Sequence, residues 1–303
     1  MGSKAILISP DTASSDRLAH KLTLVLGTSA RSKVVCDAPK ESNIVNTDGA
    51  DVGNSLAVDD YVEDMYKFYK VTEICSTSSH QVHGYMDLQY DITERERMIV
   101  VDWLIDVHRE FQLTPEVLYL AVQIFDRYLA MDLVVTKEEM QLIGVTAMFI
   151  ASKYEEVSAP NIDRFADITD NACSTEQILE MEKSIMVKFK WTLPFPTAYH
   201  FLVHFLKAAE ANEEMGNMVF FLAELGLLQY AMLKYCPSML AASAVYAAQS
   251  ALMSSPLWNE TLKLHTGYSE SQLIDCAKKL VSFCSGAAAK ECPAVFWKYS
   301  EFM

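Results

Sequence analysis

The sequence offers few side chains whose types and spacing could support catalysis or metal binding. His200 and His204 are four positions apart, so on a helix both imidazoles would lie on one face and could bind a metal ion. A metalloprotease motif requires a glutamate directly after the first histidine, and Phe201 occupies that position. We therefore interpret both histidines as ordinary buried or surface residues, and we expect neither a metal nor a cofactor.

Other features of enzymes are also missing. Glu155 and Glu156 are adjacent, as are Asp59 and Asp60, so on a helix the two carboxylates of each pair point in different directions and suit shared acid–base catalysis poorly. The sequence contains no glycine-rich phosphate loop, no Gly-x-Ser-x-Gly motif and no His-Glu-x-x-His motif. A binding or regulatory protein is therefore favoured over an enzyme.

Composition and charge narrow the class of partner. The 303 residues carry a net charge of −15, which disfavours nucleic acid because phosphate binding requires clustered Lys and Arg side chains. The seven cysteines are odd in number and lack a Cys-x-x-Cys spacing, so we expect free thiols. No apolar run reaches the roughly 18 residues that a membrane helix needs, so we expect no membrane association. A protein partner fits these features best.

A pattern of small residues at positions i, i+3 and i+7 occurs twice, 97 residues apart. The two runs are Gly144, Ala147 and Ala151, and then Ala241, Ala244 and Ala248. On a helix this spacing places the small side chains on one face, where a second helix can approach closely. Large apolar residues fill the rest of the first run, which predicts a central helix surrounded by other helices. The period is too long for a solenoid and indicates two related domains in tandem.

The elements that hold these runs are predicted to be helices. Apolar residues recur at helical spacing, helix-starting Thr and Pro residues precede several runs, and no alternating pattern of strand length is present. The fold class is therefore all-α. The expected helices are 93–110, 115–130, 136–155, 161–168 and 175–188 in the first domain, and 197–209, 213–231, 237–253, 257–264 and 270–285 in the second.

We expect four regions along the chain. Residues 1–55 are rich in Ser, Thr, Asn, Asp and Gly and are expected to form a flexible tail. Residues 56–90 contain an amphipathic helix and a linker, and the two helical domains cover 91–195 and 196–303. The final aromatic residues are expected to pack on the second domain: Phe296, Trp297, Tyr299 and Phe302.

Three motifs follow one another in the first domain. Residues 96–104 read Glu-Arg-Met-Ile-Val-Val-Asp-Trp-Leu, residues 126–129 read Asp-Arg-Tyr-Leu, and residues 151–156 read Ala-Ser-Lys-Tyr-Glu-Glu. They resemble Met-Arg-Ala-Ile-Leu-Val-Asp-Trp-Leu, Asp-Arg-Phe-Leu and Ala-Ser-Lys-Phe-Glu-Glu of the cyclin family. The similarity is to mitotic B-type cyclins, most closely the B1-type cyclins of plants, and it extends over about residues 56–300.

The resemblance implies two tandem five-helix cyclin boxes preceded by an N-terminal helix. It further implies a regulatory subunit that binds and activates a cyclin-dependent protein kinase at G2/M, in the nucleus and cytoplasm, without catalysing a reaction itself. Such kinases need an ion pair between a Lys and the Glu of their αC helix before phosphoryl transfer, and the bound subunit stabilises that arrangement. A paired-box adaptor in transcription and an inactive cyclin-like protein remain open as alternatives.

The resemblance also implies which residues contact the kinase. Lys153 and Glu182 match the family's Lys and Glu, which bind the kinase backbone beside its αC helix. From the residues alone, the two could equally form a mutual surface ion pair. Met186 and Trp191 also match contact positions, although helical periodicity would more often place them in the core. The remaining matching positions are Tyr61, Met65, Tyr154 and Glu155.

Two further sets of residues follow from the resemblance. Arg97 and Asp126 match a structural pair that ties the first helix of the box to the second, the alternative being a solvated Arg97. A second set matches a patch that docks Arg-x-Leu segments of substrates or inhibitors, although its spacing also suits a core stripe. This patch consists of Ile99, Val100, Trp103, Asp106 and Gln141.

The sequence departs from the family pattern at two points. Glu96 replaces a Met that lines the docking patch, which puts a charge beside an apolar surface. Neither Arg-x-x-Leu nor Lys-Glu-Asn, the usual destruction signals of mitotic cyclins, occurs in the 303 residues. The route of degradation is therefore open.

Overall fold

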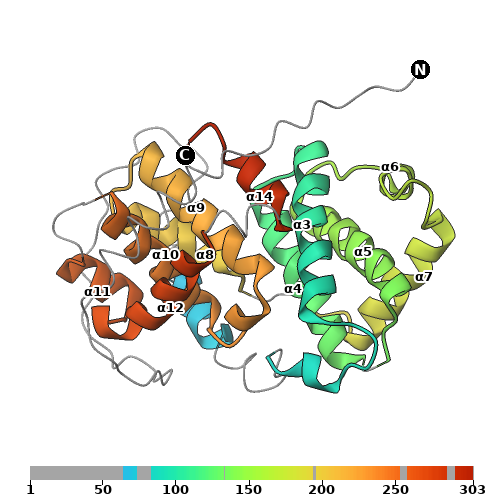
Figure 1. Cartoon of the computed structure of the whole chain (residues 1–303), viewed down its shortest axis with the longest axis horizontal. Helices are drawn as coiled ribbons and strands as arrows, with labels where there is room; N and C mark the ends of the chain where they lie inside the picture. Colours follow the sequence, from blue (N-terminus) through green and yellow to red (C-terminus); the bar gives the residue numbers. More distant parts are fainter. Residues whose placement is uncertain are drawn as a thin grey trace.

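The computed structural model describes residues 64–73, 83–132, 134–193, 196–252, 258–284 and 291–302. Every regular element within these ranges is a helix, so the all-α prediction is confirmed there. Figure 1 shows two groups of helices side by side, the first green to yellow and the second orange to red. Among the described helices, none combines the length and the apolar character needed to cross a membrane. The predicted tail, residues 1–55, lies outside the described ranges.

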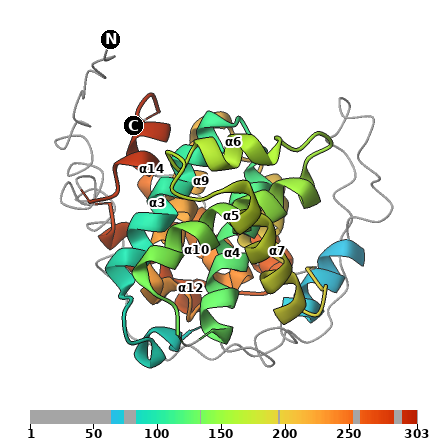
Figure 2. The same cartoon turned by 90° about the vertical axis from the view of Figure 1, so that its right-hand side faces the viewer.

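The first domain is built around one central helix. This helix is α5 (Lys137–Glu155), and it contacts α3 (Glu94–Glu110), α4 (Pro115–Met131), α6 (Ile162–Asp167) and α7 (Thr175–Lys188). Figure 2 looks onto this domain, with α5 lying among its neighbours. All of the α5 positions in the apolar run are buried, on every side of the helix. The sequence therefore predicted the central helix correctly.

Local sequence explains where the helices of the first domain begin. Three helices start with a capping box. In this motif a Ser or Thr side chain accepts a bond from the backbone N–H three residues later, and the Glu or Gln side chain at that later position accepts a bond from the backbone N–H of the Ser or Thr. The pairs are Thr93 with Glu96, Thr136 with Glu139 and Ser174 with Gln177. Pro115 begins α4, where the missing N–H would have had no helical partner anyway.

The second domain repeats this plan around α10 (Pro237–Ala251), which is buried along almost its whole length. Its neighbours are α8 (Ala198–Ala208), α9 (Glu213–Leu228) and α12 (Glu270–Ser282), and α11 (Glu260–Thr266) packs on α8. Asn259 caps α11 by accepting a bond from the Leu262 N–H, and Gly267 ends it in the left-handed conformation, φ 75°. These two signals place α11 two to three residues later than predicted.

The clearest difference from the predicted helices is at the end of α9. The pattern predicted a helix over 213–231, but α9 ends at Leu228, Gln229 is extended, and Tyr230–Met232 forms a separate short 3-10 helix, η2. The last carbonyls of a helix lack partners within it. At this end the Leu228 carbonyl accepts a bond from Arg97 of α3, 3.0 Å away. A contact between domains therefore coincides with the end of the helix.

The last helix, α14 (Pro293–Lys298), packs on both domains rather than on the second alone. Its Ala294 N–H donates to Asp102 of α3 over 3.3 Å, and the ring of Phe296 meets that of Phe221 on α9 edge-on at 5.4 Å. Phe302 was expected to pack as well, but it lies beyond this helix and is about half exposed. The predicted packing on the second domain is therefore confirmed for Phe296, and it was wrong only for Phe302.

Gly144 allows the closest approach in the first domain. A Cβ at this position would lie 2.9 Å from Cγ1 of Val100 on α3, and β-branched Val cannot easily turn away. By contrast, a Cβ on Gly216 of α9 would meet nothing within 4 Å. The close helix contact that the small-residue pattern predicted is therefore present between α5 and α3.

This difference gives a matched stability test. Gly216→Ala should raise the free energy of unfolding by about 0.5–1 kcal/mol, because Ala is the better helix former. Gly144→Ala gains the same propensity, but overpacking against Val100 opposes it by about 1–3 kcal/mol. Urea unfolding of both variants should therefore show one stabilised and one destabilised protein. Equal stabilisation of the two would mean that α3 and α5 are not closely packed.

Candidate binding surfaces

Lys153 and Glu182 lie together on the surface of the first domain. Lys153, near the end of α5, donates a hydrogen bond from Nζ to Oε1 of Glu182 on α7, and its ammonium lies 4.2 Å from the centre of the Phe149 ring. The Lys153 side chain is 42% exposed and that of Glu182 is 19% exposed. The mutual ion pair is therefore formed in the free chain, while both groups stay accessible to a partner.

Four further predicted contact residues lie near the ends of α5 and α7. Tyr154 is more than half exposed, Glu155 is partly buried, and Met186 packs partly against the core. Trp191 is 68% exposed, so the alternative of a core tryptophan is wrong. Lys190 and Trp191 both have left-handed backbone angles, and the Trp191 N–H bonds the Met186 carbonyl over 2.9 Å. This closing turn of α7 leaves the indole on the surface.

Residues 64–73 form a helical segment with two different faces. Met65, Phe68 and Val71, at i, i+3 and i+6, are each more than half exposed. Phe68 and Val71 were not among the predicted contact residues, although their spacing from Met65 could have indicated them. The predicted contact Tyr61 lies outside the described residues. The exposed apolar face of this segment is the kind of surface that a partner can bury.

The segment lies beside the end of α5. The pKa of the Tyr69 hydroxyl is raised by burial and by its neighbours Glu155 and Tyr154. The pKa of Glu155 is raised as well, by burial and by Glu116 and Glu156. Segment 64–73 and the ends of α5 and α7 thus contribute to one surface, which we call the composite face.

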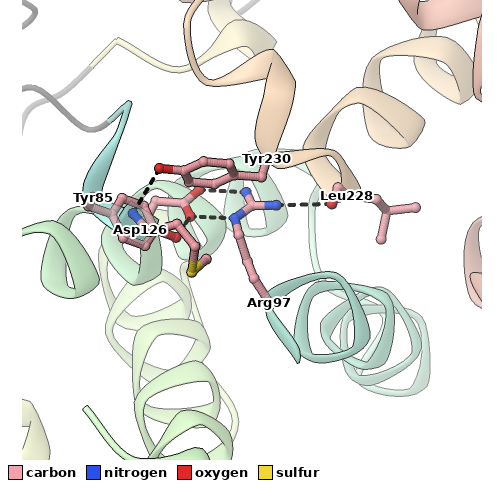
Figure 3. Close-up of polar contacts among 6 residues, drawn as sticks. Tyr85, Arg97, Asp126, Leu228 and Tyr230 are labelled. Atoms are coloured by element: carbon pink, nitrogen blue, oxygen red, sulfur yellow. Dashed lines mark hydrogen bonds and ion pairs between the residues drawn. The ribbon is translucent and has the colours of Figure 1, made fainter. Parts of the chain in front are cut away.

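Arg97 and Asp126 form a bidentate ion pair inside the molecule (Figure 3). Arg97 is fully buried, and it donates from Nε to Oδ1 over 2.6 Å and from Nη2 to Oδ2 over 2.7 Å. The Tyr85 hydroxyl donates to the same carboxylate over 2.9 Å, and the third guanidinium bond reaches the Leu228 carbonyl. The alternative of a solvated Arg97 is therefore wrong.

Electrostatics explain why these groups occur together. Burial alone would lower the pKa of Arg97, but the Asp126 carboxylate reverses this effect and the pKa lies above its usual value. The pKa of Tyr85 is also raised, by burial and by Asp126. The bond to Leu228 extends the network into the second domain. Sequence analysis missed this link because a backbone carbonyl has no signature in the sequence.

The predicted docking patch is accessible at the surface. Ile99 is about half exposed, and Val100, Trp103, Asp106 and Gln141 are all partly exposed. They project from α3 and from the start of α5. The alternative of a core stripe is therefore wrong for Ile99, whereas Val100 and Trp103 also pack partly against the core.

Glu96, at the edge of the patch, has two partners. It completes the capping box of α3 with Thr93, and its Oε1 lies 3.1 Å from Nζ of Lys137 on α5. The bonds from Thr93 and Lys137 lower the pKa of Glu96 to about 2, so it is ionised at any physiological pH. Because Lys137 compensates its charge, Glu96 perturbs the patch less than an isolated carboxylate would.

His200 and His204 face segment 64–73. The His204 ring stacks on Tyr66 with centroids 4.3 Å apart, and the His200 ring lies 4.5 Å from that of Tyr69. Across the described ranges, no group of three or more His, Cys, Asp or Glu side chains is arranged to hold a metal ion. Both histidines therefore contribute to packing between the segment and the second domain.

The chain has two helical domains in tandem, each built around a central helix. Comparison with known proteins identifies the family that has this architecture. Residues 64–194 match the cyclin N-terminal domain and residues 196–302 match the cyclin C-terminal domain. The structure of a viral cyclin from herpesvirus saimiri shares the fold, with a TM-score of 0.63, 20% identity, and coverage of 74% of this chain and 99% of the viral one. The chain belongs to the cyclin family.

Its relatives include plant mitotic cyclins. G2/mitotic-specific cyclin S13-6 of Glycine max is 50% identical over 93% of this chain and 61% of its own length. Cyclin-B1-2 of Arabidopsis thaliana is 47% identical over 93% of this chain and 62% of its own length. G2/mitotic-specific cyclin S13-7 of Glycine max is 52% identical over 78% of this chain and 91% of its own length. The chain thus spans about three fifths of the first two relatives.

The buried ion pair gives a second test. Arg97→Met leaves the Asp126 carboxylate buried without its counter-charge, and Asp126→Leu does the same to the guanidinium. Each single variant should lose about 3–5 kcal/mol of unfolding free energy. The double variant should lose clearly less than the sum, because neither charge then remains. Additive losses in a denaturation double-mutant cycle would contradict the coupling.

Proposed function

We propose that this chain is the regulatory subunit of a cyclin-dependent protein kinase and acts at the transition from G2 to mitosis, in the nucleus and cytoplasm. The observation that carries the proposal is the composite face, where an accessible Lys–Glu pair lies among exposed apolar residues. Relatives about 50% identical are named G2/mitotic-specific cyclins, which supports the same role. The catalytic groups belong to the kinase.

The proposed activation is a shift of population. Moving a kinase from 1% to 99% in its active arrangement needs about 5.5 kcal/mol of preferential binding to that arrangement. An interface of ordinary size, about 800 Å² on each partner, can supply this energy. Burial of Met65, Phe68 and Trp191 would contribute apolar area, and Lys153 with Glu182 would fix the register on the kinase backbone.

The mutual pairing of Lys153 and Glu182 suits this role. In the free chain each group neutralises the other, and the stacked Phe149 ring restrains the lysine stem. A partner can therefore bond both heads without first ordering two flexible side chains. Less conformational entropy is then lost on binding.

We further propose that the α3 patch docks Arg-x-Leu segments of substrates or inhibitors. Ile99 and Trp103 offer apolar surface for the leucine, and the Asp106 carboxylate offers a counter-charge for the arginine. Burial raises the pKa of Asp106, although Arg109, 3.0 Å away, partly opposes this effect. An incoming arginine would favour the ionised carboxylate in the same way.

The Lys153–Glu182 pair provides the main test of kinase binding. The variant Lys153→Ala with Glu182→Ala should bind the kinase more weakly by about 2–5 kcal/mol, because partly desolvated charge contacts are lost. Its unfolding free energy should change by no more than about 1 kcal/mol, since the pair is solvent-accessible. Titration calorimetry would measure the loss of kinase affinity, histone phosphorylation the loss of activation, and urea unfolding the change in stability.

A matched control is present on α11, where Lys263 and Glu260 form a surface pair at 2.7 Å. Lys263→Ala with Glu260→Ala removes an equivalent ion pair and should leave kinase affinity unchanged. The swap Lys153→Glu with Glu182→Lys keeps an ion pair but reverses its direction, so it should still fail to bind. Normal activation by the swapped or the double-alanine variant would disprove the contact.

Glu96→Met tests the docking patch. The variant removes a carboxylate from the rim of an apolar surface and should bind Arg-x-Leu peptides more tightly, although Lys137 compensation keeps the gain modest. It also loses a capping box, as Glu139→Met on α5 does, so the latter variant controls for helix stability. Peptide affinity should be measured at several salt concentrations. Weaker binding by the Met variant, most marked at low salt, would show that Glu96 attracts the arginine instead.

A further inference from the structure

Segment 64–73 is held on the second domain by a buried polar cluster. The Glu73 carboxylate accepts bonds from the backbone N–H and the hydroxyl of Ser238, at 2.6 and 2.8 Å. Ser238 lies in the first turn of α10, where backbone amides are free and the helix dipole favours an anion. Lys70 donates to the same hydroxyl over 2.8 Å, and the Tyr268 hydroxyl lies 2.8 Å from it.

Histidines face the same segment one to two turns earlier. The Tyr66 ring stacks on His204, and its hydroxyl donates to the backbone carbonyl of His265 over 2.7 Å. The His204 and His265 rings are themselves within 3.3 Å through their ring nitrogens. Tyr69 packs on His200. The docked face of the segment thus meets titratable groups along its whole length, while Met65 and Phe68 on the other face remain exposed.

We propose that Glu73 and the facing histidines form a proton-sensitive latch, in which Glu73 is a positioning residue that holds Met65 and Phe68 toward the kinase. The inference rests on the proposed function for the role of the composite face. The latch itself follows from the contacts described above and does not depend on that function. Through the latch, the second domain would contribute to kinase binding independently of the Lys153–Glu182 pair.

The sign of the Glu73 contribution follows from its surroundings. The pKa of Glu73 is raised to about 7, because burial and Cys236 raise it by more than Lys70 and the two Ser238 bonds lower it. Among the described residues, the hydroxyls of Tyr66 and Tyr268 also face it. Undocking would expose the carboxyl and return its pKa to about 4.5. Docking is therefore favoured by the proton and weakens as pH rises through 7.

The histidines act in the opposite direction. Burial lowers the pKa of His204 to about 4, with help from His265 and Lys207. Burial also lowers the pKa of His200, partly opposed by Thr197 and Glu116. Undocking would relieve this burial, so protonation favours the undocked segment as pH falls below about 6.5. Below about pH 6.5 the Glu73 and histidine effects therefore oppose each other, so docking of the wild-type segment should change little there, and removal of either group should reveal the effect of the other.

Amide hydrogen exchange of residues 64–73 in the full chain tests the latch without a kinase. After correction for intrinsic exchange, Glu73 alone should lower protection about fourfold between pH 6.5 and 8, and the histidines oppose this fall, so it should be larger in His204→Phe than in the wild-type chain. Glu73→Gln keeps a hydrogen-bonding amide without the charge and should abolish this fall. Glu73→Ala should lose protection at every pH. His204→Phe should keep the ring stack, and its protection should rise as pH falls from 6.5 to 5, because less histidine protonation then opposes Glu73.

Glu270→Gln is the matched control, because this carboxylate also bonds a tyrosine hydroxyl, that of Tyr246 at 2.6 Å, but on α12. It should leave the profile unchanged. Protection that does not vary with pH in His204→Phe, or a Glu73→Gln variant that behaves like Glu73→Ala, would overturn the latch. Kinase affinity measured in parallel should follow the protection. Affinity that stays constant while protection changes would overturn the positioning role, whereas a wild-type chain that binds no kinase would refute only the proposed function.

Discussion

The guanidinium of Arg97 is a full positive charge from which water is excluded, and isolating such a charge costs several kcal/mol. In the fold it donates two bonds to the Asp126 carboxylate on α4, which compensates the charge, and one to the carbonyl that ends α9. These bonds can form together only where α3, α4 and α9 meet. The requirement therefore fixes α3 against both domains. It also fixes the direction in which the docking patch on α3 faces.

Charges that are proposed to contact a partner, unlike Arg97, are accessible to solvent. Lys153 with Glu182 and Glu96 with Lys137 are local pairs that solvent can reach. Pairs of this kind stabilise the fold by only about 0–1 kcal/mol, so a partner can replace one at little expense to folding. The degree of burial thus separates a charge that defines the structure from charges that are available for binding. Segment 64–73 shows a similar division, because the charge of Glu73 is buried and the apolar face with Met65, Phe68 and Val71 is exposed.

Sequence analysis predicted the elements whose signals are local. Pro115, the capping boxes and the apolar run around Gly144 each determine a helix through neighbours within one or two turns, and the helices begin where these signals lie. The family resemblance led to the Arg97–Asp126 pair, but not to Leu228, whose carbonyl has no side-chain signature. The exposure of Trp191 depends on a left-handed turn, and that of Phe68 on how its helix docks. Periodicity alone specifies neither.

The composite face requires that three segments distant in sequence bind one kinase together. The most direct measurement is amide hydrogen exchange of the full chain with and without a cyclin-dependent kinase. Binding should protect residues 64–73, 151–156 and 182–191 together, and leave the exposed side of α3 around Ile99 unchanged. Protection confined to α3, or absent from any of the three segments, would contradict the account.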